Sequence, residues 1–221
     1  MNNGIIEKNT AANTEFDSII FDLDGTLWDS TPRVLESWKE TIDSCDKIKK
    51  PLTKEDLEGV FGTKHSLIGR KLFPYLDDET VDDLMEKCYN AENELLSRVG
   101  GTLYEDLEEV IKKLSEKIPL FIVSNCQKGY IETFLKYHKL GRYFKDFECS
   151  GNTDLSKDEN IKLIMKRNNL KSPVYVGDTM GDYDAAKAAG LPFIFAKYGF
   201  GEVKTPDFVI EKFNGLLDII K

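Results

Sequence analysis

Short apolar runs recur along the chain, and most of them end in a polar or acidic residue. They are rich in β-branched and aromatic residues and show no alternation of apolar and polar positions. Runs of this kind are typical of strands buried on both faces of a parallel sheet. The predicted strands lie at residues 18–21, 120–123, 174–176, 193–195 and 208–210.

Helical patterns lie between these runs, because apolar residues there recur three and four positions apart. The last of these patterns stops at Gly190, a natural helix end. Alternating strands and helices predict an α/β fold, a three-layer sandwich with a mostly parallel, Rossmann-like sheet. In such sheets, ligands bind at the carboxyl ends of the strands.

The alternation is interrupted after the first strand, where the chain shows only helical patterns for about seventy residues. One of these helices is predicted to begin at Thr53, since an acid follows three positions later at Asp56. A helical segment in this place indicates a small cap on two hinges. The expected division is a polar tail at 1–15, a Rossmann-like catalytic core at 16–31 and 100–221, and an all-helical cap at 32–99.

Composition and charge narrow the class of partner. The 221 residues carry a formal net charge of −9, which argues against binding nucleic acid or an anionic membrane. No apolar run approaches the length of a membrane span, and residues 1–15 lack the features of a secretory signal. The four cysteines are scattered without a C-x-x-C pair. We therefore expect reduced thiols and a cytoplasmic location.

A carboxylate cluster is the strongest chemical signal. Asp22 and Asp24 lie two residues apart after the first strand, so their side chains can face one site, and Gly25 permits the turn that follows. Asp178 and Asp182 follow a later strand. Acids gathered at one sheet edge repel one another unless a cation lies among them. Oxygen ligands at a site that handles phosphate favour Mg²⁺.

Four short motifs occur in a fixed order: Asp-Leu-Asp-Gly-Thr at 22–26, Ser124 at a strand end, Lys157 upstream of Asn160, and the Gly-Asp to Asp stretch at 177–182. In this set the chain resembles the haloacid dehalogenase superfamily, in its phosphatase branch with a helical cap (phosphoglycolate phosphatase-like). The resemblance covers nearly all of the chain beyond the N-terminal tail. It implies hydrolysis of a small phosphorylated metabolite.

The resemblance also implies catalytic roles. Asp22 would be the nucleophile and would form an aspartyl-phosphate. Asp24 would be the general acid and then the base that activates water. Mg²⁺ would be held by the Asp22 carboxylate, the Asp24 backbone carbonyl and Asp178. The acid at position 24 favours phosphate esters, because dehalogenase and phosphonate-cleaving members lack an acid there.

Further roles follow for the other motifs. Thr26, Ser124 and Asn125 would bind the phosphate oxygens, and the Asn125 side chain could contact the substrate. Lys157 would offset the negative charge of the nucleophile and the phosphate. Asp182 would not bind the metal directly. It would orient either the water molecules bound to the metal or Lys157.

The cap offers a less specific signal. A glycine-containing loop joins two of its helical stretches, and related caps carry a substrate-reading loop in this place. The candidate substrate-reading residues are Thr63, Lys64, His65 and Arg70. Ordinary surface charges explain these residues at least as well.

Two other functions fit the same motifs. A phosphomutase of the β-phosphoglucomutase type would pass the aspartyl-phosphate to a sugar instead of water. A non-enzymatic phospho-acceptor domain also phosphorylates an aspartate on an α/β sheet. The helical insert and Asp24 argue against the acceptor, which needs neither a cap nor an acid for a leaving group.

Overall fold

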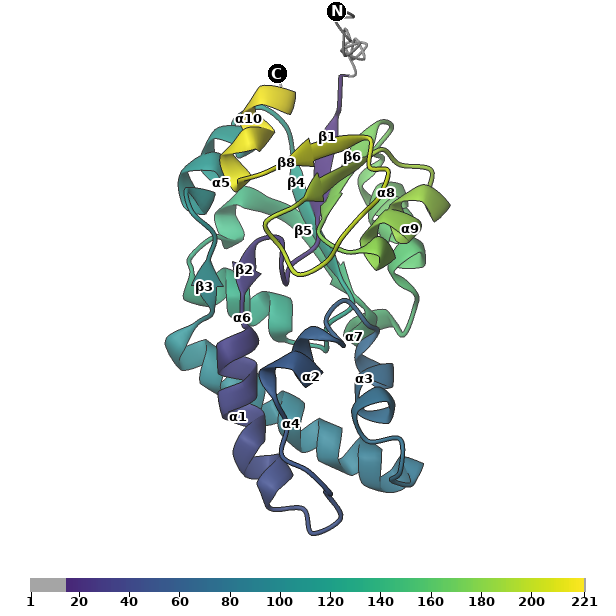
Figure 1. The fold of residues 1–221 in the computed structure, drawn as a ribbon. Coiled ribbons are helices and arrows are strands. Elements are labelled where there is room, and N and C mark those ends of the chain that lie inside the picture. The colour runs from purple at the N-terminus through teal and green to yellow at the C-terminus, as the bar shows by residue number, and fades with distance from the viewer. Residues whose placement is uncertain (1–14, 221) are drawn as a thin grey trace, which may run out of the picture.

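The computed structural model describes residues 15–220 and shows a six-stranded parallel sheet (Figure 1). The strand order is β5-β4-β1-β6-β7-β8, so the first strand of the chain lies in the middle. The strands are β1 (Ser18–Phe21), β4 (Leu120–Ser124), β5 (Phe144–Cys149), β6 (Pro173–Gly177), β7 (Phe193–Ala196) and β8 (Phe208–Ile210). The predicted α/β sandwich is confirmed, with β5 as one strand that the apolar runs did not indicate. The expected polar tail lies outside the described residues except for Glu15.

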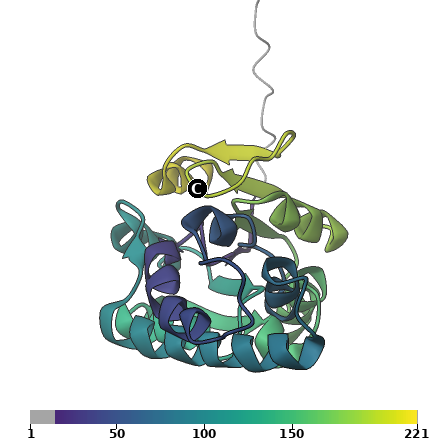
Figure 2. The same ribbon diagram turned by 60° about the horizontal axis from the view of Figure 1, so that its bottom comes forward.

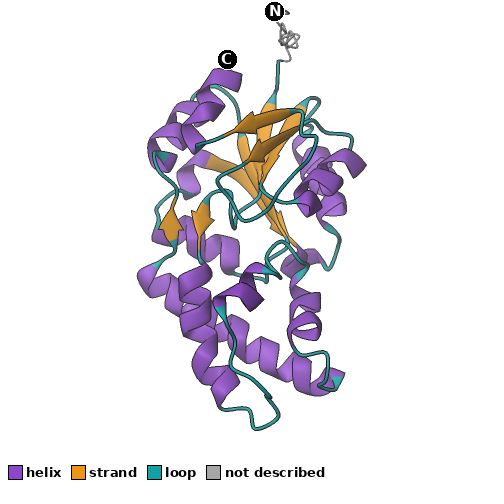
Figure 3. Ribbon diagram, in the orientation of Figure 1, coloured by secondary structure: helices purple, strands orange, loops and turns teal. Residues whose placement is uncertain are grey.

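Helices cover both faces of the sheet, as the secondary-structure colouring shows (Figure 3). Alternate residues of β1 point to opposite faces, so Phe21 packs in one apolar core and Ile20 in the other. The first core includes helices α5 (Leu107–Ser115), α6 (Tyr130–Tyr137) and α10 (Leu216–Ile219). The second includes α8 (Lys157–Asn168) and α9 (Met180–Ala188). Short elements complete this part of the chain: α7 (Ser150–Thr153) and the 3₁₀ turns η1 (Gly141–Tyr143) and η2 (Phe213–Gly215).

The helical insert comprises the helices α1 (Thr31–Asp43), α2 (Lys54–Glu58), α3 (His65–Leu72) and α4 (Asp78–Val99). It has an apolar core of its own, to which Val34, Leu57 and Cys88 belong. The chain leaves and re-enters the sheet domain through the antiparallel pair of β2 (Trp28–Asp29) and β3 (Thr102–Leu103). When the molecule is turned, the insert lies in front of the sheet (Figure 2).

Local signals place several helix ends. Helix α2 begins after Thr53 with a capping box to Asp56, as the sequence predicts. Ser156 with Glu159 and Thr179 with Asp182 form the same motif before α8 and α9. Within residues 15–220, no helix is both long enough and apolar enough to cross a bilayer.

Candidate active site

The carboxyl ends of the central strands bring the predicted motifs together. Asp22 follows β1, Ser124 ends β4 and Asp178 follows β6, and these three strands are neighbours in the sheet. All three side chains are buried. Because the strands are parallel, residues about 50 to 150 positions apart in the sequence meet at one edge.

Lys157 joins this cluster from the first position of α8. Its Nζ atom lies 2.8 Å from Asp22 Oδ1 and 2.5 Å from Asp182 Oδ1. Burial opposes the charged form of the lysine, but the two carboxylates outweigh it and raise the pKa of Lys157 well above its ordinary value. The lysine therefore remains a cation beside the predicted nucleophile.

The carboxylates outnumber the lysine at this edge. One oxygen from each of Asp22, Asp178 and Asp182 lies within 4.8 Å of the others. Burial and the charge of Asp182 raise the pKa of Asp22 to about 7. Burial and the other two acids likewise raise the pKa of Asp178. A divalent cation would offset this excess of negative charge, and the donors are hard oxygen atoms, so the residues present fit Mg²⁺.

Existing hydrogen bonds distinguish the acids from one another. Asp182 is held on both oxygens, since Oδ1 accepts from Lys157 and Oδ2 accepts from the Thr179 hydroxyl at 2.6 Å. Asp178 Oδ2 accepts from the backbone N–H of Phe200 at 2.7 Å, and its Oδ1 accepts weakly from the hydroxyl of Thr26 at 3.3 Å. The structure thus places Thr26 against Asp178, fully buried.

Asp24 has a separate set of partners. Its Oδ1 accepts hydrogen bonds from Trp28 Nε1 at 2.9 Å, Ser30 Oγ at 2.8 Å and Tyr130 Oη at 2.9 Å. Burial raises the pKa of Asp24 to about 6, although these three donors favour its ionised form. Among the described residues, no hydrogen bond uses Oδ2. Oδ2 is therefore the oxygen on which the neutral acid would carry its proton.

Asn125 connects the sheet to the helical insert. Its Nδ2 donates to the Gly62 carbonyl at 2.8 Å, and its backbone carbonyl accepts from His65 N at 3.0 Å. Lys64 adds a bond from Nζ to Asp154 Oδ1 at 2.7 Å. These contacts hold the insert over the carboxyl edge of the sheet.

The predicted cap residues are dispersed. Thr63 lines the cavity beside the carboxylates, whereas Lys64 pairs with Asp154. Arg70 pairs with Asp78 and Asp82 on the surface of the insert. Arg70 and His65 line a second, neighbouring cavity.

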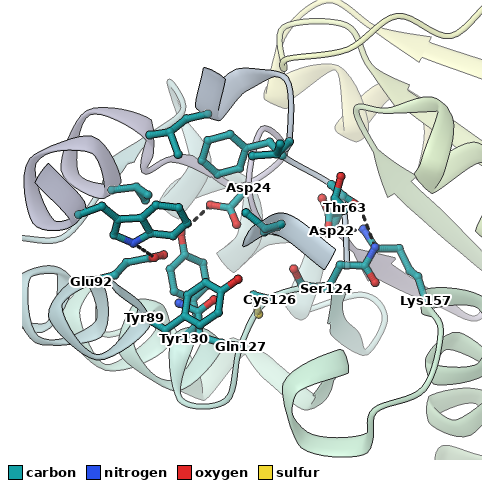
Figure 4. Close-up of a pocket in the computed structure, with 18 residues that line it drawn as sticks. Asp22, Asp24, Thr63, Tyr89, Glu92, Ser124, Cys126, Gln127, Tyr130 and Lys157 are labelled. Carbon is teal, nitrogen blue, oxygen red and sulfur yellow. Dashed lines mark hydrogen bonds and ion pairs between the residues drawn. The ribbon is translucent and has the colours of Figure 1, made fainter. Parts of the chain in front are cut away.

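A cavity lies between the sheet edge and the insert (Figure 4). Asp22, Ser124 and Lys157 line one end, and Asp24 lies towards the middle. Several residues that line the rest were not predicted as site residues, among them Trp38, Tyr89, Glu92, Gln127 and Tyr130. Glu92 had a detectable signal, because it replaces an apolar residue in the buried stripe of α4 between Cys88 and Leu96.

Comparison with known proteins decides the family. Residues 19–196 match the model of haloacid dehalogenase-like hydrolases. The chain belongs to this family. The match covers most of the chain, including all four motifs.

Related proteins support the class of enzyme. A phosphoglycolate phosphatase of Photobacterium profundum is 27% identical over 219 residues, covering 92% of this chain and 95% of that protein. A relative from Caldanaerobacter subterraneus, named as a pyrophosphatase, is 28% identical over 214 residues, and the match covers 92% of this chain and 94% of that protein. The crystal structure of a predicted phosphoglycolate phosphatase from Haemophilus somnus matches with a TM-score of 0.82 at 19% identity. The match covers 95% of this chain and 99% of that one. The predictions of a haloacid dehalogenase-like phosphatase and of its fold are therefore confirmed.

Proposed function

We propose that the protein is a Mg²⁺-dependent phosphomonoester hydrolase that acts on a small phosphorylated metabolite in the cytoplasm through an aspartyl-phosphate on Asp22. The observation that carries the proposal is the position of the Asp22 carboxylate. It accepts a hydrogen bond from Lys157 and lies beside Asp178 and Asp182 at the carboxyl edge of the sheet. The helical insert, at residues 32–99, serves in this proposal as a cap over a core formed by 16–31 and 100–221.

The reaction has two displacements at phosphorus. Asp22 attacks the phosphate, the ester P–O bond breaks, and the leaving oxygen takes the proton of Asp24. Asp24, now a carboxylate, removes a proton from water while the water oxygen attacks phosphorus. The bond between phosphorus and Asp22 then breaks, which restores Asp22 and releases inorganic phosphate. Lys157 stays protonated and reduces repulsion between the two anions.

Mg²⁺ would be held by the carboxylates of Asp22 and Asp178 and by the Asp24 backbone carbonyl. When bound, it supplies positive charge that offsets the charge of the phosphate. Ser124 and the backbone N–H of Asn125 are proposed to bind the phosphate oxygens, and Thr26, whose hydroxyl donates to Asp178 Oδ1, to position that acid instead of the phosphate. Asp182 fits the role of orienting Lys157, because its Oδ1 accepts from Lys157 at 2.5 Å while Thr179 holds its Oδ2.

Phosphate release from 4-nitrophenyl phosphate tests the proposal. We expect turnover with Mg²⁺, loss of turnover in excess EDTA, and recovery when Mg²⁺ is restored. Saturating Mg²⁺ should also raise the melting temperature of the wild type by roughly 5 to 10 °C, because an ion that binds only the folded state stabilises it. The turnover with Mg²⁺ and the rise in melting temperature should both be lost in Asp178→Asn. Both should be kept in Asp184→Asn, because Asp184 is an exposed residue of α9. Full turnover in excess EDTA would refute the requirement for the metal.

The three donors to Asp24 allow a test of its role as an acid. Tyr130→Phe removes one hydrogen bond to the ionised carboxylate, so the pKa of Asp24 should rise above its value of about 6. Since the acid must be protonated, the alkaline limb of kcat/KM should move to higher pH by about half to one unit. Tyr137→Phe, on the exposed side of the same helix, is the control. An unmoved limb in Tyr130→Phe would argue against Asp24 as the acid.

A further inference from the structure

The cavity extends beyond Asp24 to a second polar end, formed by Glu92 of α4 and Gln127 (Figure 4). Glu92 is 4% exposed, and its Oε2 accepts a hydrogen bond from Trp38 Nε1 at 2.7 Å. Gln127 is 8% exposed, and its side-chain amide lies beside the Glu92 carboxyl, where it favours the ionised form. This end therefore offers buried polar atoms to an occupant of the cavity.

Glu92 lacks a cationic partner. Within residues 15–220 it forms no ion pair, and Lys157, which lines the same cavity, is already bonded to Asp22 and Asp182. Burial raises the pKa of Glu92 to about 8, as expected for a carboxyl without a counter-charge. A positive group on a ligand would supply that charge.

The walls between the two polar ends are apolar and aromatic. Trp38 and Tyr89 lie with their ring centroids 5.7 Å apart, and Val34 and Leu57 complete this side. Aromatic faces attract cations, and they also pack against aliphatic chains. The cavity volume is about 50 Å³, and this space includes the end that Asp22, Ser124 and Lys157 line. The leaving group that fits is therefore small.

We infer that the leaving group of the substrate is a small amino alcohol whose ammonium group pairs with Glu92. This inference rests on the proposed function and specifies its substrate class. A leaving group with a carboxylate, as in phosphoglycolate, would instead find no free cation at this end of the cavity among the described residues. The cavity thus selects against the substrate named for several relatives of the chain.

Three phosphate esters of similar size test the inference: 2-aminoethyl phosphate, propyl phosphate and phosphoglycolate. The amine and propyl compounds differ chiefly in charge. We expect kcat/KM of the wild type for 2-aminoethyl phosphate to exceed the values for the other two by roughly 100-fold, because the ammonium group holds Glu92 ionised, whereas the other two leaving groups meet a carboxyl that keeps its proton below pH 8. Equal values for 2-aminoethyl and propyl phosphate, or a preference for phosphoglycolate, would overturn the inference.

Glu92→Gln tests the residue itself, because glutamine keeps the volume and can still accept from Trp38. It should lower kcat/KM for 2-aminoethyl phosphate by roughly 10- to 100-fold and leave propyl phosphate unchanged. Glu94→Gln, exposed on the same helix, is the control and should change neither value. An unchanged value for the amine substrate in Glu92→Gln would refute the pairing.

The two proposals fail in different ways. If the wild type releases no phosphate from propyl phosphate or from 4-nitrophenyl phosphate with Mg²⁺, the proposed function is wrong. If it hydrolyses these esters without preferring the amine, only the inference is wrong. Should Glu92→Gln fail to fold, the selectivity of the wild type decides alone.

Discussion

Replacement of Asp22 by asparagine is expected to lower the turnover of phosphate esters by at least about 1,000-fold. An amide oxygen is a poor nucleophile, so the aspartyl-phosphate cannot form. The variant should remain folded. The folded-state pKa of Asp22, about 7, lies above its ordinary value of 3.8, so the contribution of this acid to stability is lost as the pH rises through 7. At pH 8 without metal, the variant should therefore melt no lower than the wild type.

Two measurements separate loss of chemistry from other effects. Asp184→Asn makes the same chemical change at an exposed position and should keep full turnover. Mass spectrometry of acid-quenched wild type during turnover should find one added phosphoryl group on the peptide that contains Asp22. Retention of more than a tenth of the activity in Asp22→Asn would refute the covalent route, as would a phosphoryl group on another residue.

The sheet could be predicted because its central strands are buried on both faces and carry little polar sequence. Strand β5 escaped the prediction because it is an edge strand, paired with β4 alone, and, unlike the edge strand β8, it carries acidic residues within its span. Its sequence includes Asp146 and Glu148, which pair with Arg167 of α8. An edge strand covered by an ion pair needs no continuous apolar run, so the pattern used for the other strands could not detect it.

The motif residues could also be predicted, because each adjoins a strand end or, for Lys157, a helix start. The partners across the cavity could not. Tyr130 bonds Asp24 across 106 positions of sequence, and Lys64 bonds Asp154 across 90. Such contacts depend on how the helices and the insert pack against the sheet. Periodicity shows that a helix has a buried face, but it does not show what that face contacts.

Lys157→Met is expected to cause the largest loss of stability among the variants considered. The methionine leaves Asp22 and Asp182 buried without their cation, which costs roughly 3 to 5 kcal/mol of unfolding free energy near pH 8 without metal. The loss should depend on pH. Without the lysine, the folded-state pKa of Asp22 rises further, and stability then falls as the pH rises through that value. At pH 5 Asp22 is protonated, so the loss should shrink.

Urea unfolding of the wild type and Lys157→Met at pH 5 and pH 8 measures this difference. Lys162→Met is the matched control, since Lys162 lies on the same helix and pairs with Asp158 at the surface. It should cost less than about 1 kcal/mol at either pH. An equal loss at pH 5 and pH 8 in Lys157→Met would assign the effect to packing of the aliphatic chain. A loss confined to pH 8 that Mg²⁺ reverses in part would instead show that the lysine and the metal offset the same carboxylate charge.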